Sequence, residues 1–191
     1  MLIYEGLASE LILIEQSLIR WNYENAYTYY KNGGGTIEFF DPAYEEINKK
    51  LMKLDATIDS YLKNLIKPHF DYSAEEVTQK DSRDINQEDR EKLIAAIEGT
   101  SHQNIIVTHG TFTMAETAKI VADALTGVKK KIIFTGSMIP IAGFNVSDAG
   151  FNLGFVAGSF DGLSAGVYLS MNGGVFPPNE AEKNLDSFRF E

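Results

Sequence analysis

Residues 104–121 constrain the fold of this chain more than any other segment. They begin with a β-branched apolar run, break at Gly110, and continue with apolar residues spaced three or four apart. This pattern predicts a buried strand, a tight turn and an amphipathic helix. In open α/β sheets, ligands bind where strands end and free helix N–H groups begin. We therefore expect a ligand site at this turn, where Thr111 and Thr113 present hydroxyl groups.

Segments of similar character flank this turn on both sides. β-prone runs that end in glycine turns lie at 26–30, 131–135 and 166–171, and helix-like segments lie at 43–67, 86–98 and 148–160. We also expect Asn86 to cap the helix that it begins, a short strand at 69–72 and a packed turn at 188–191. Strands and helices thus alternate, with crossovers long enough for parallel pairing. The order predicts an α/β fold with a doubly wound, mainly parallel sheet flanked by helices.

The first 22 residues carry their apolar side chains at helical spacing, which predicts an amphipathic helix. We interpret 1–24 as an N-terminal helical extension and 25–191 as the only domain. Such a helix either packs on the core of its own domain or mediates oligomerisation, and the sequence leaves both open.

The composition excludes several classes of function. The 191 residues contain no cysteine, which excludes disulfides, thiolate metal sites and a cysteine nucleophile. The net charge of −10 argues against a nucleic-acid partner, because phosphate contacts need a basic face. No apolar run approaches the roughly 20 residues that a membrane span requires, and the glutamates within 1–22 make a poor signal peptide. We expect a cytoplasmic protein with no membrane association, metal or cofactor.

The residues at the predicted strand ends allow one kind of chemistry without any family information. Thr36 follows three glycines, and Thr111 and Thr113 follow the central strand. A threonine hydroxyl is a weak nucleophile unless a base takes its proton. Lys183 could take that proton if burial or its neighbours lowered its pKa. Because G-x-S-x-G and metal-ligand spacings are missing from the sequence, these residues alone predict only a small polar ligand at the strand ends.

Several segments resemble, in the same order, motifs of the bacterial-type L-asparaginase family. GGTI at 34–37 and VTHGTFTMAETA at 107–118 resemble its two signature motifs. Segments 81–84, 134–140, 147–153 and 166–171, together with Lys183, resemble further parts of its catalytic domain. The resemblance covers roughly residues 27–191 and implies a short, single-domain protein without the family's C-terminal domain. It also implies a homo-oligomer, either a dimer or a tetramer.

The resemblance implies hydrolysis of a side-chain carboxamide, that of asparagine, glutamine or a related amide, to the acid and ammonia. It assigns the nucleophile to Thr36, the second catalytic hydroxyl to Thr111, and the activating group to Lys183. Ser82 would bind the substrate carboxylate. The full set of substrate-binding positions is Gly35, Ser82, Arg83, Gly110 and Phe112, with the glycines bringing backbone N–H groups close to ligand oxygens.

Phe112 is the position where the sequence departs from the family pattern. The family motif has an aspartate there, which pairs with the substrate α-ammonium, and phenylalanine cannot replace it. Leaving a bound ammonium without its partner costs about 3–5 kcal/mol. Three hypotheses stay open: an active amidohydrolase that prefers an amide without a free α-amino group, a weak or inactive relative that binds an amide or carboxylate ligand or a protein partner, and a component of an amidotransferase-type assembly.

Overall fold

The computed structural model of the chain describes residues 11–16, 58–139, 147–187 and 189–191. The expected strand at 26–30, the glycine turn with Gly35 and Thr36, and most of the expected helix 43–67 lie outside the described residues.

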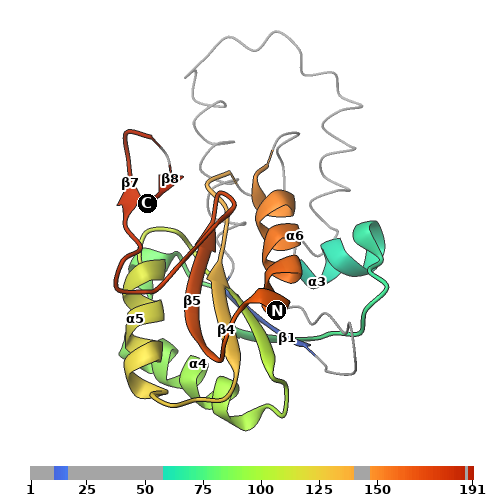
Figure 1. Ribbon diagram of the computed structural model, residues 1–191, viewed down its shortest axis with the longest axis horizontal. Coiled ribbons are helices and arrows are strands. Elements are labelled where there is room, and N and C mark those ends of the chain that lie inside the picture. The colour runs from blue at the N-terminus through green and yellow to red at the C-terminus, as the bar shows by residue number, and fades with distance from the viewer. Residues whose placement is uncertain (1–10, 17–57, 140–146, 188) are drawn as a thin grey trace, which may run out of the picture.

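A six-stranded sheet forms the centre of the fold, as Figure 1 shows. Its strands are β1 Leu11–Gln16, β2 Ser73–Thr78, β3 Asn104–Thr108, β4 Lys131–Thr135, β5 Gly166–Met171 and β6 Gly174–Phe176. They lie in the order β2-β1-β3-β4-β5-β6, and all neighbours pair parallel except β5 and β6. This arrangement confirms the predicted mainly parallel α/β sheet.

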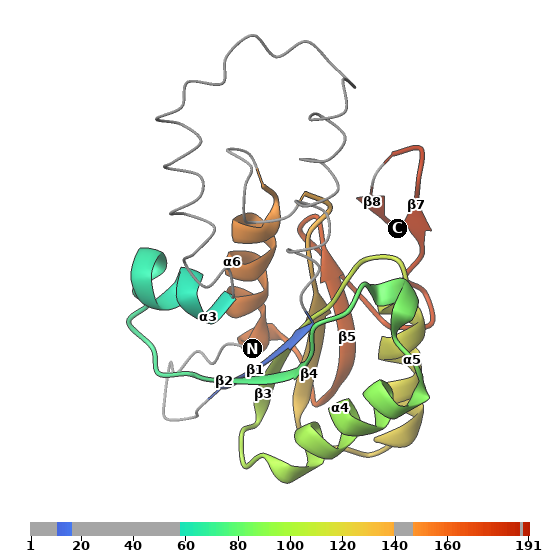
Figure 2. The same cartoon turned by 180° about the vertical axis from the view of Figure 1, so that it is seen from behind.

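Helices cover both faces of the sheet. They are α3 Ile58–Tyr61, α4 Gln87–Gly99, α5 Met114–Ala124 and α6 Ala149–Ser159. Figures 1 and 2 show α4 and α5 together on one side and α3 and α6 on the other, as expected for a doubly wound sheet. Short helical turns are η1 Leu62–Ile66, η2 Ser82–Asp84 and η3 Phe160–Gly162, and a separate hairpin joins β7 Lys183–Asn184 to β8 Arg189–Phe190. None of the described helices is long and apolar enough to cross a membrane.

The central strand β3 is buried along its whole length. Ile105, Ile106 and Val107 have no exposed surface, and neither do Ile132, Ile133 and Phe134 of the neighbouring β4. Continuous β-branched and aromatic runs are typical of parallel strands that are covered on both faces. The core therefore holds the carboxyl ends of β3 and β4 side by side, and the turn after β3 lies at this edge.

The N-terminal segment corrects one expectation. The amphipathic helix predicted over 1–22 is wrong for residues 11–16, which form strand β1 between β2 and β3. Four consecutive apolar residues at 11–14 fit a strand covered on both faces as well as a helix, and a run this short does not distinguish the two. Neighbouring strands on both sides decide in favour of the strand. The division of the chain into 1–24 and 25–191 stays a prediction.

Two further details differ from the expectation. A short strand was expected near 69–72, but strand β2 begins at Ser73. Its four leading residues are exposed, so the alternation that identifies a half-buried strand is weak. The C-terminal residues, expected as a packed turn, form β8, in which Phe190 is buried.

Candidate active site

The turn between β3 and α5 places Thr111 beside Lys183. Lys183 Nζ donates a hydrogen bond of 2.7 Å to Thr111 Oγ1, although the two residues are 72 positions apart in the chain. The Thr111 side chain is buried, and Lys183 comes from β7 of the C-terminal hairpin. The structure thus brings together two of the three predicted catalytic residues.

Lys183 is a partly buried amine with no acidic partner among the described residues. Burial lowers the pKa of Lys183 below its ordinary value. None of the ion pairs among the described residues includes it. A carboxylate beside the amine would hold the proton more tightly and raise the pKa. Without one, the neutral amine that could accept a proton from Thr111 is formed at lower pH.

Phe112 lies against two cations, Lys183 and Arg83. Its ring centroid is 4.2 Å from Lys183 Nζ and 5.0 Å from Arg83 Cζ. Both distances are within the range of cation–π attraction. Phe112 is 57% exposed, so the ring is positioned by these cations at the surface and not by the hydrophobic core.

Arg83 is itself held by a carboxylate. Its Nε and Nη2 donate to Asp81 Oδ1 and Oδ2 at 2.9 and 2.7 Å, which is the bidentate geometry that arginine favours. The hydrogen bonds from Arg83 lower the pKa of Asp81. The charge of Asp81 is therefore balanced by Arg83.

Ser82 joins the same group through its backbone. Thr113 Oγ1 donates to the Ser82 carbonyl at 2.6 Å, which ties the Ser82 turn to the start of α5. The Ser82 side chain is 1% exposed, and none of the described residues forms a hydrogen bond with its hydroxyl. Buried polar groups normally have partners. The Ser82 hydroxyl is therefore a buried polar group that the described residues leave without a partner.

A capping box holds the loop that carries Ser82. Asn86 caps α4, as predicted, and exchanges hydrogen bonds with Asp89, whose side chain is buried. Lys80 pairs with the same carboxylate at 2.7 Å. The loop between Lys80 and Asn86 is thus tied at both ends to one buried acid.

The turn after β3 lies in close backbone contact with the end of β4. His109 N–H donates to the Thr135 carbonyl at 2.8 Å and so links the ends of β3 and β4. A Cβ on Gly136 would overlap the His109 carbonyl oxygen and lie 2.8 Å from Met114 Cε. Only glycine permits this approach.

His109 is a buried, neutral side chain that the sequence did not single out. Its Nδ1 donates to the Gly110 carbonyl at 2.8 Å, and burial lowers the pKa of His109 to about 4. At neutral pH the imidazole therefore carries no charge, and it shapes the turn at Gly110 without contributing a cation to the site.

Hydrogen bonds of the Asp148 carboxylate and the Asn152 amide join α6 to the segment that follows β4. The Asp148 carboxylate accepts from the backbone N–H groups of Met138 and Ile139, both at 2.9 Å, and from Asn152 Nδ2 at 3.0 Å. Asn152 Nδ2 also donates to the Gly136 carbonyl at 2.9 Å. The start of α6 is thereby fixed to the end of β4.

The same set of hydrogen bonds reaches the strand pair that carries Lys183. Asn172 N–H donates to Asn152 Oδ1 at 3.1 Å, and Phe190 N–H donates to Asn172 Oδ1 at 3.2 Å. Phe190 lies in β8, which pairs directly with Lys183 of β7. The sequence did not identify this support, because Asn152, Asn172 and Phe190 lie in separate segments of the chain. No local pattern links them.

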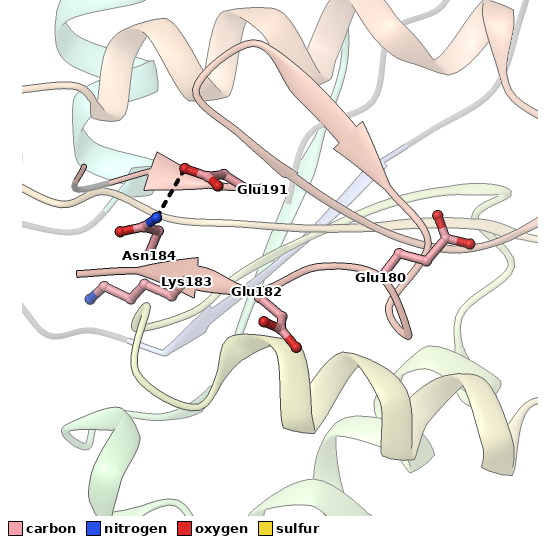
Figure 3. A pocket seen from close by; sticks show the side chains of 5 residues that line it. All are labelled: Glu180, Glu182, Lys183, Asn184 and Glu191. Carbon is pink, nitrogen blue, oxygen red and sulfur yellow. Dashed lines mark hydrogen bonds between the residues drawn. The ribbon is translucent and has the colours of Figure 1, made fainter. Parts of the chain in front are cut away.

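A hollow of about 350 Å³ lies on the hairpin that carries Lys183. Figure 3 shows its lining residues, which are Glu180, Glu182, Lys183, Asn184 and Glu191. In this view the Lys183 amine points away from the carboxylates of Glu180 and Glu182. Within the described part of the chain, no group of His, Asp and Glu side chains could hold a metal ion.

The fold and these contacts define an α/β protein with a candidate ligand site at the carboxyl ends of its parallel strands. The chain belongs to the asparaginase family, because the model of the asparaginase N-terminal domain matches residues 31–190. This match confirms the resemblance seen in the sequence. A search of curated proteins finds no match.

Two crystal structures show the same fold. A probable cytoplasmic L-asparaginase from Campylobacter jejuni superposes with a TM-score of 0.64 at 19% identity, over 92% of this chain and 48% of that one. L-asparaginase I from Vibrio cholerae O1 biovar eltor str. N16961 superposes with a TM-score of 0.63 at 19% identity, over 96% of this chain and 51% of that one. The present chain thus spans about half the length of these two proteins.

Proposed function

We propose that this chain is an amidohydrolase that uses a threonine nucleophile to hydrolyse a carboxamide to the acid and ammonia. The observation that carries the proposal is the 2.7 Å hydrogen bond between Lys183 Nζ and buried Thr111 Oγ1. A hydroxyl beside an amine with a lowered pKa is the arrangement needed to move a proton from oxygen to nitrogen. Membership of the asparaginase family supports the same chemistry.

The reaction proceeds in two acyl-transfer steps. The Thr36 hydroxyl attacks the carboxamide carbon and its proton passes through Thr111 to Lys183. The C–N bond then breaks as the amide nitrogen takes up this proton and leaves as ammonia. Water then attacks the threonine ester and releases the acid and the free hydroxyl. Lys183 in its neutral form accepts a proton through Thr111 and returns it to the leaving group. Gly35 and Gly110 present N–H groups to the carbonyl oxygen as it gains charge.

Substrate binding is assigned to the group beside Thr111. The unpartnered Ser82 hydroxyl and the Arg83 guanidinium are donors suited to a carboxylate. Gly35 and Thr36 lie outside the described residues, so their roles rest on the motif match. The cytoplasmic location, the homo-oligomeric state and the amidotransferase-type assembly stay predictions.

One observation favours a second candidate function. The Phe112 ring occupies the surface beside Lys183, where the family motif has a carboxylate. A chain that has lost this acid could bind an amide or carboxylate ligand, or a protein partner, with weak or no turnover.

Ammonia release from asparagine, glutamine and simple amides separates the two candidates. Thr36→Ala and Thr111→Val should each lower kcat about a hundredfold or more, because each removes one hydroxyl of the proposed proton path. Thr111→Ser keeps the hydroxyl and should retain most of the activity. Thr126→Val, which removes an exposed hydroxyl bonded only to the Asp123 carbonyl among the described residues, is the matched control. Activity that survives both Thr36→Ala and Thr111→Val would refute the proposal.

A further inference from the structure

Two cations lie beside Phe112 in the turn that carries Thr111, and they differ in their acidic neighbours. Arg83 and Lys183 both lie over the Phe112 ring, at 5.0 and 4.2 Å. Asp81 and Asp84 are the described acids near Arg83, and both oxygens of Asp81 are engaged by Arg83. Lys183 has no ion pair among the described residues, and burial alone accounts for its lowered pKa. The described acids of this group therefore lie beside Arg83, and none of them forms an ion pair with Lys183.

We infer that the site takes ω-amides of carboxylic acids that lack an α-ammonium group, and that Phe112 is the residue that sets this specificity. The inference rests on the proposed function and names its substrate class. The preferred substrate is a monoanion, such as the monoamide of butanedioic acid, and not zwitterionic asparagine.

A substrate ammonium would meet two unfavourable conditions here. It would lie near Arg83 and Lys183, whose like charge repels it at short range. The face of the Phe112 ring also attracts cations, but it is already in contact with both of these side chains. An ammonium that loses water without gaining a partner is strongly disfavoured.

A substrate without the ammonium meets neither penalty. Its one carboxylate has donors in the Ser82 hydroxyl and the Arg83 guanidinium. Its methylene carbons can pack against the Phe112 side chain, because that residue is 57% exposed.

The glutamates of the neighbouring hollow do not supply the missing acid. Glu182 and Lys183 are adjacent at β7, and side chains alternate between the two sides of a strand. Figure 3 shows the Lys183 amine directed away from Glu180 and Glu182.

Calorimetric titration of the full chain with succinate and with L-aspartate tests the inference without requiring turnover. These probes differ only in the α-ammonium group. Wild-type protein should bind succinate about tenfold or more tightly than L-aspartate. Phe112→Asp should lower this ratio about tenfold or more, because it supplies an acid for the ammonium. Phe112→Leu, which is uncharged, should keep the preference.

The matched control is Phe151→Asp, because Phe151 is a similarly exposed phenylalanine, at 61%, on α6. It should leave the ratio unchanged. Equal binding of the two probes, tighter binding of L-aspartate, or no binding of either would overturn the inference. This central comparison uses wild-type protein, so it stands even where a Phe112 variant fails to fold.

Ammonia release from the monoamide of butanedioic acid and from asparagine separates this inference from the proposed function. Faster release from the monoamide is the expected result. Release from asparagine at the same rate or faster would refute the substrate class and keep the amidohydrolase. Tighter succinate binding with no ammonia from any amide would refute the amidohydrolase and keep the ligand class.

Discussion

The Lys183 amine lies 4.2 Å from the centroid of the Phe112 ring, at the position where the family motif has an aspartate. An aromatic face attracts an ammonium group more weakly than a carboxylate does, and it adds no net charge. Exchanging one for the other changes both the specificity of the site and the acidity of its proposed base.

Phe112→Asp should move the pH dependence of amide hydrolysis to higher pH. Activity that requires neutral Lys183 rises with pH through the pKa of that amine. Burial lowers this pKa in the wild-type protein, and a new carboxylate beside the amine raises it again. We expect the rising limb of kcat/KM against pH to shift to higher pH. A Phe112→Leu control should not shift it upward, and an unchanged or acid-shifted limb in Phe112→Asp would refute the role of Lys183.

Acid should destabilise the fold through His109. The pKa of this histidine is about 4 in the fold and 6.5 in the unfolded chain, so the unfolded chain binds more protons between these values. Stability should therefore fall as pH decreases from 6.5 toward 4, by about 3 kcal/mol in total. Urea denaturation at a series of pH values measures this slope.

The control for His109 is another histidine. His109→Gln should flatten the pH dependence, whereas His69→Gln changes an exposed side chain and should leave it as in the wild type. Equal slopes in the wild-type protein and both variants would show that His109 does not control the acid response.

Gly136→Ala should destabilise the protein by about 1–3 kcal/mol. The added methyl group overlaps the His109 carbonyl oxygen and approaches Met114, so the ends of β3 and β4 must separate. Gly158→Ala is the matched control, because a Cβ there has no atom within 4 Å and the position lies inside α6. That control should stabilise the protein by about 0.5–1 kcal/mol. Denaturant midpoints that do not differ between the two variants would contradict the close approach at Gly136.

Asp89→Ala should cost about 3 kcal/mol of stability and weaken ligand binding. The change removes the buried partner of Lys80 and one half of the capping box of α4, which together hold the Ser82 loop. Glu88→Ala removes the neighbouring acid, whose pair with Lys92 is exposed, and should leave stability nearly unchanged. Thermal unfolding and succinate titration of both variants check this difference, and equal losses would contradict it.

Local patterns in the chain predicted the parts of the fold that depend on neighbours in sequence. The apolar run at 105–107 is a buried strand, Asn86 caps α4, and α5 follows the Gly110 turn. Each of these features depends on burial periodicity or on hydrogen bonds within a few residues. The amphipathic pattern of 1–22 was misleading at 11–16 because pairing with β2 and β3, and not local spacing, makes that segment a strand.

The candidate site divides in the same way. The sequence alone determined the family, the sheet class, and which hydroxyls and amine are available for chemistry, because these follow from residue identity and order. Only the tertiary structure decided that Lys183 reaches Thr111 from 72 positions away and that the Phe112 ring contacts two cationic side chains. These contacts form because β7 packs beside the turn after β3. The spacing of residues within either segment does not predict which distant segment packs against it.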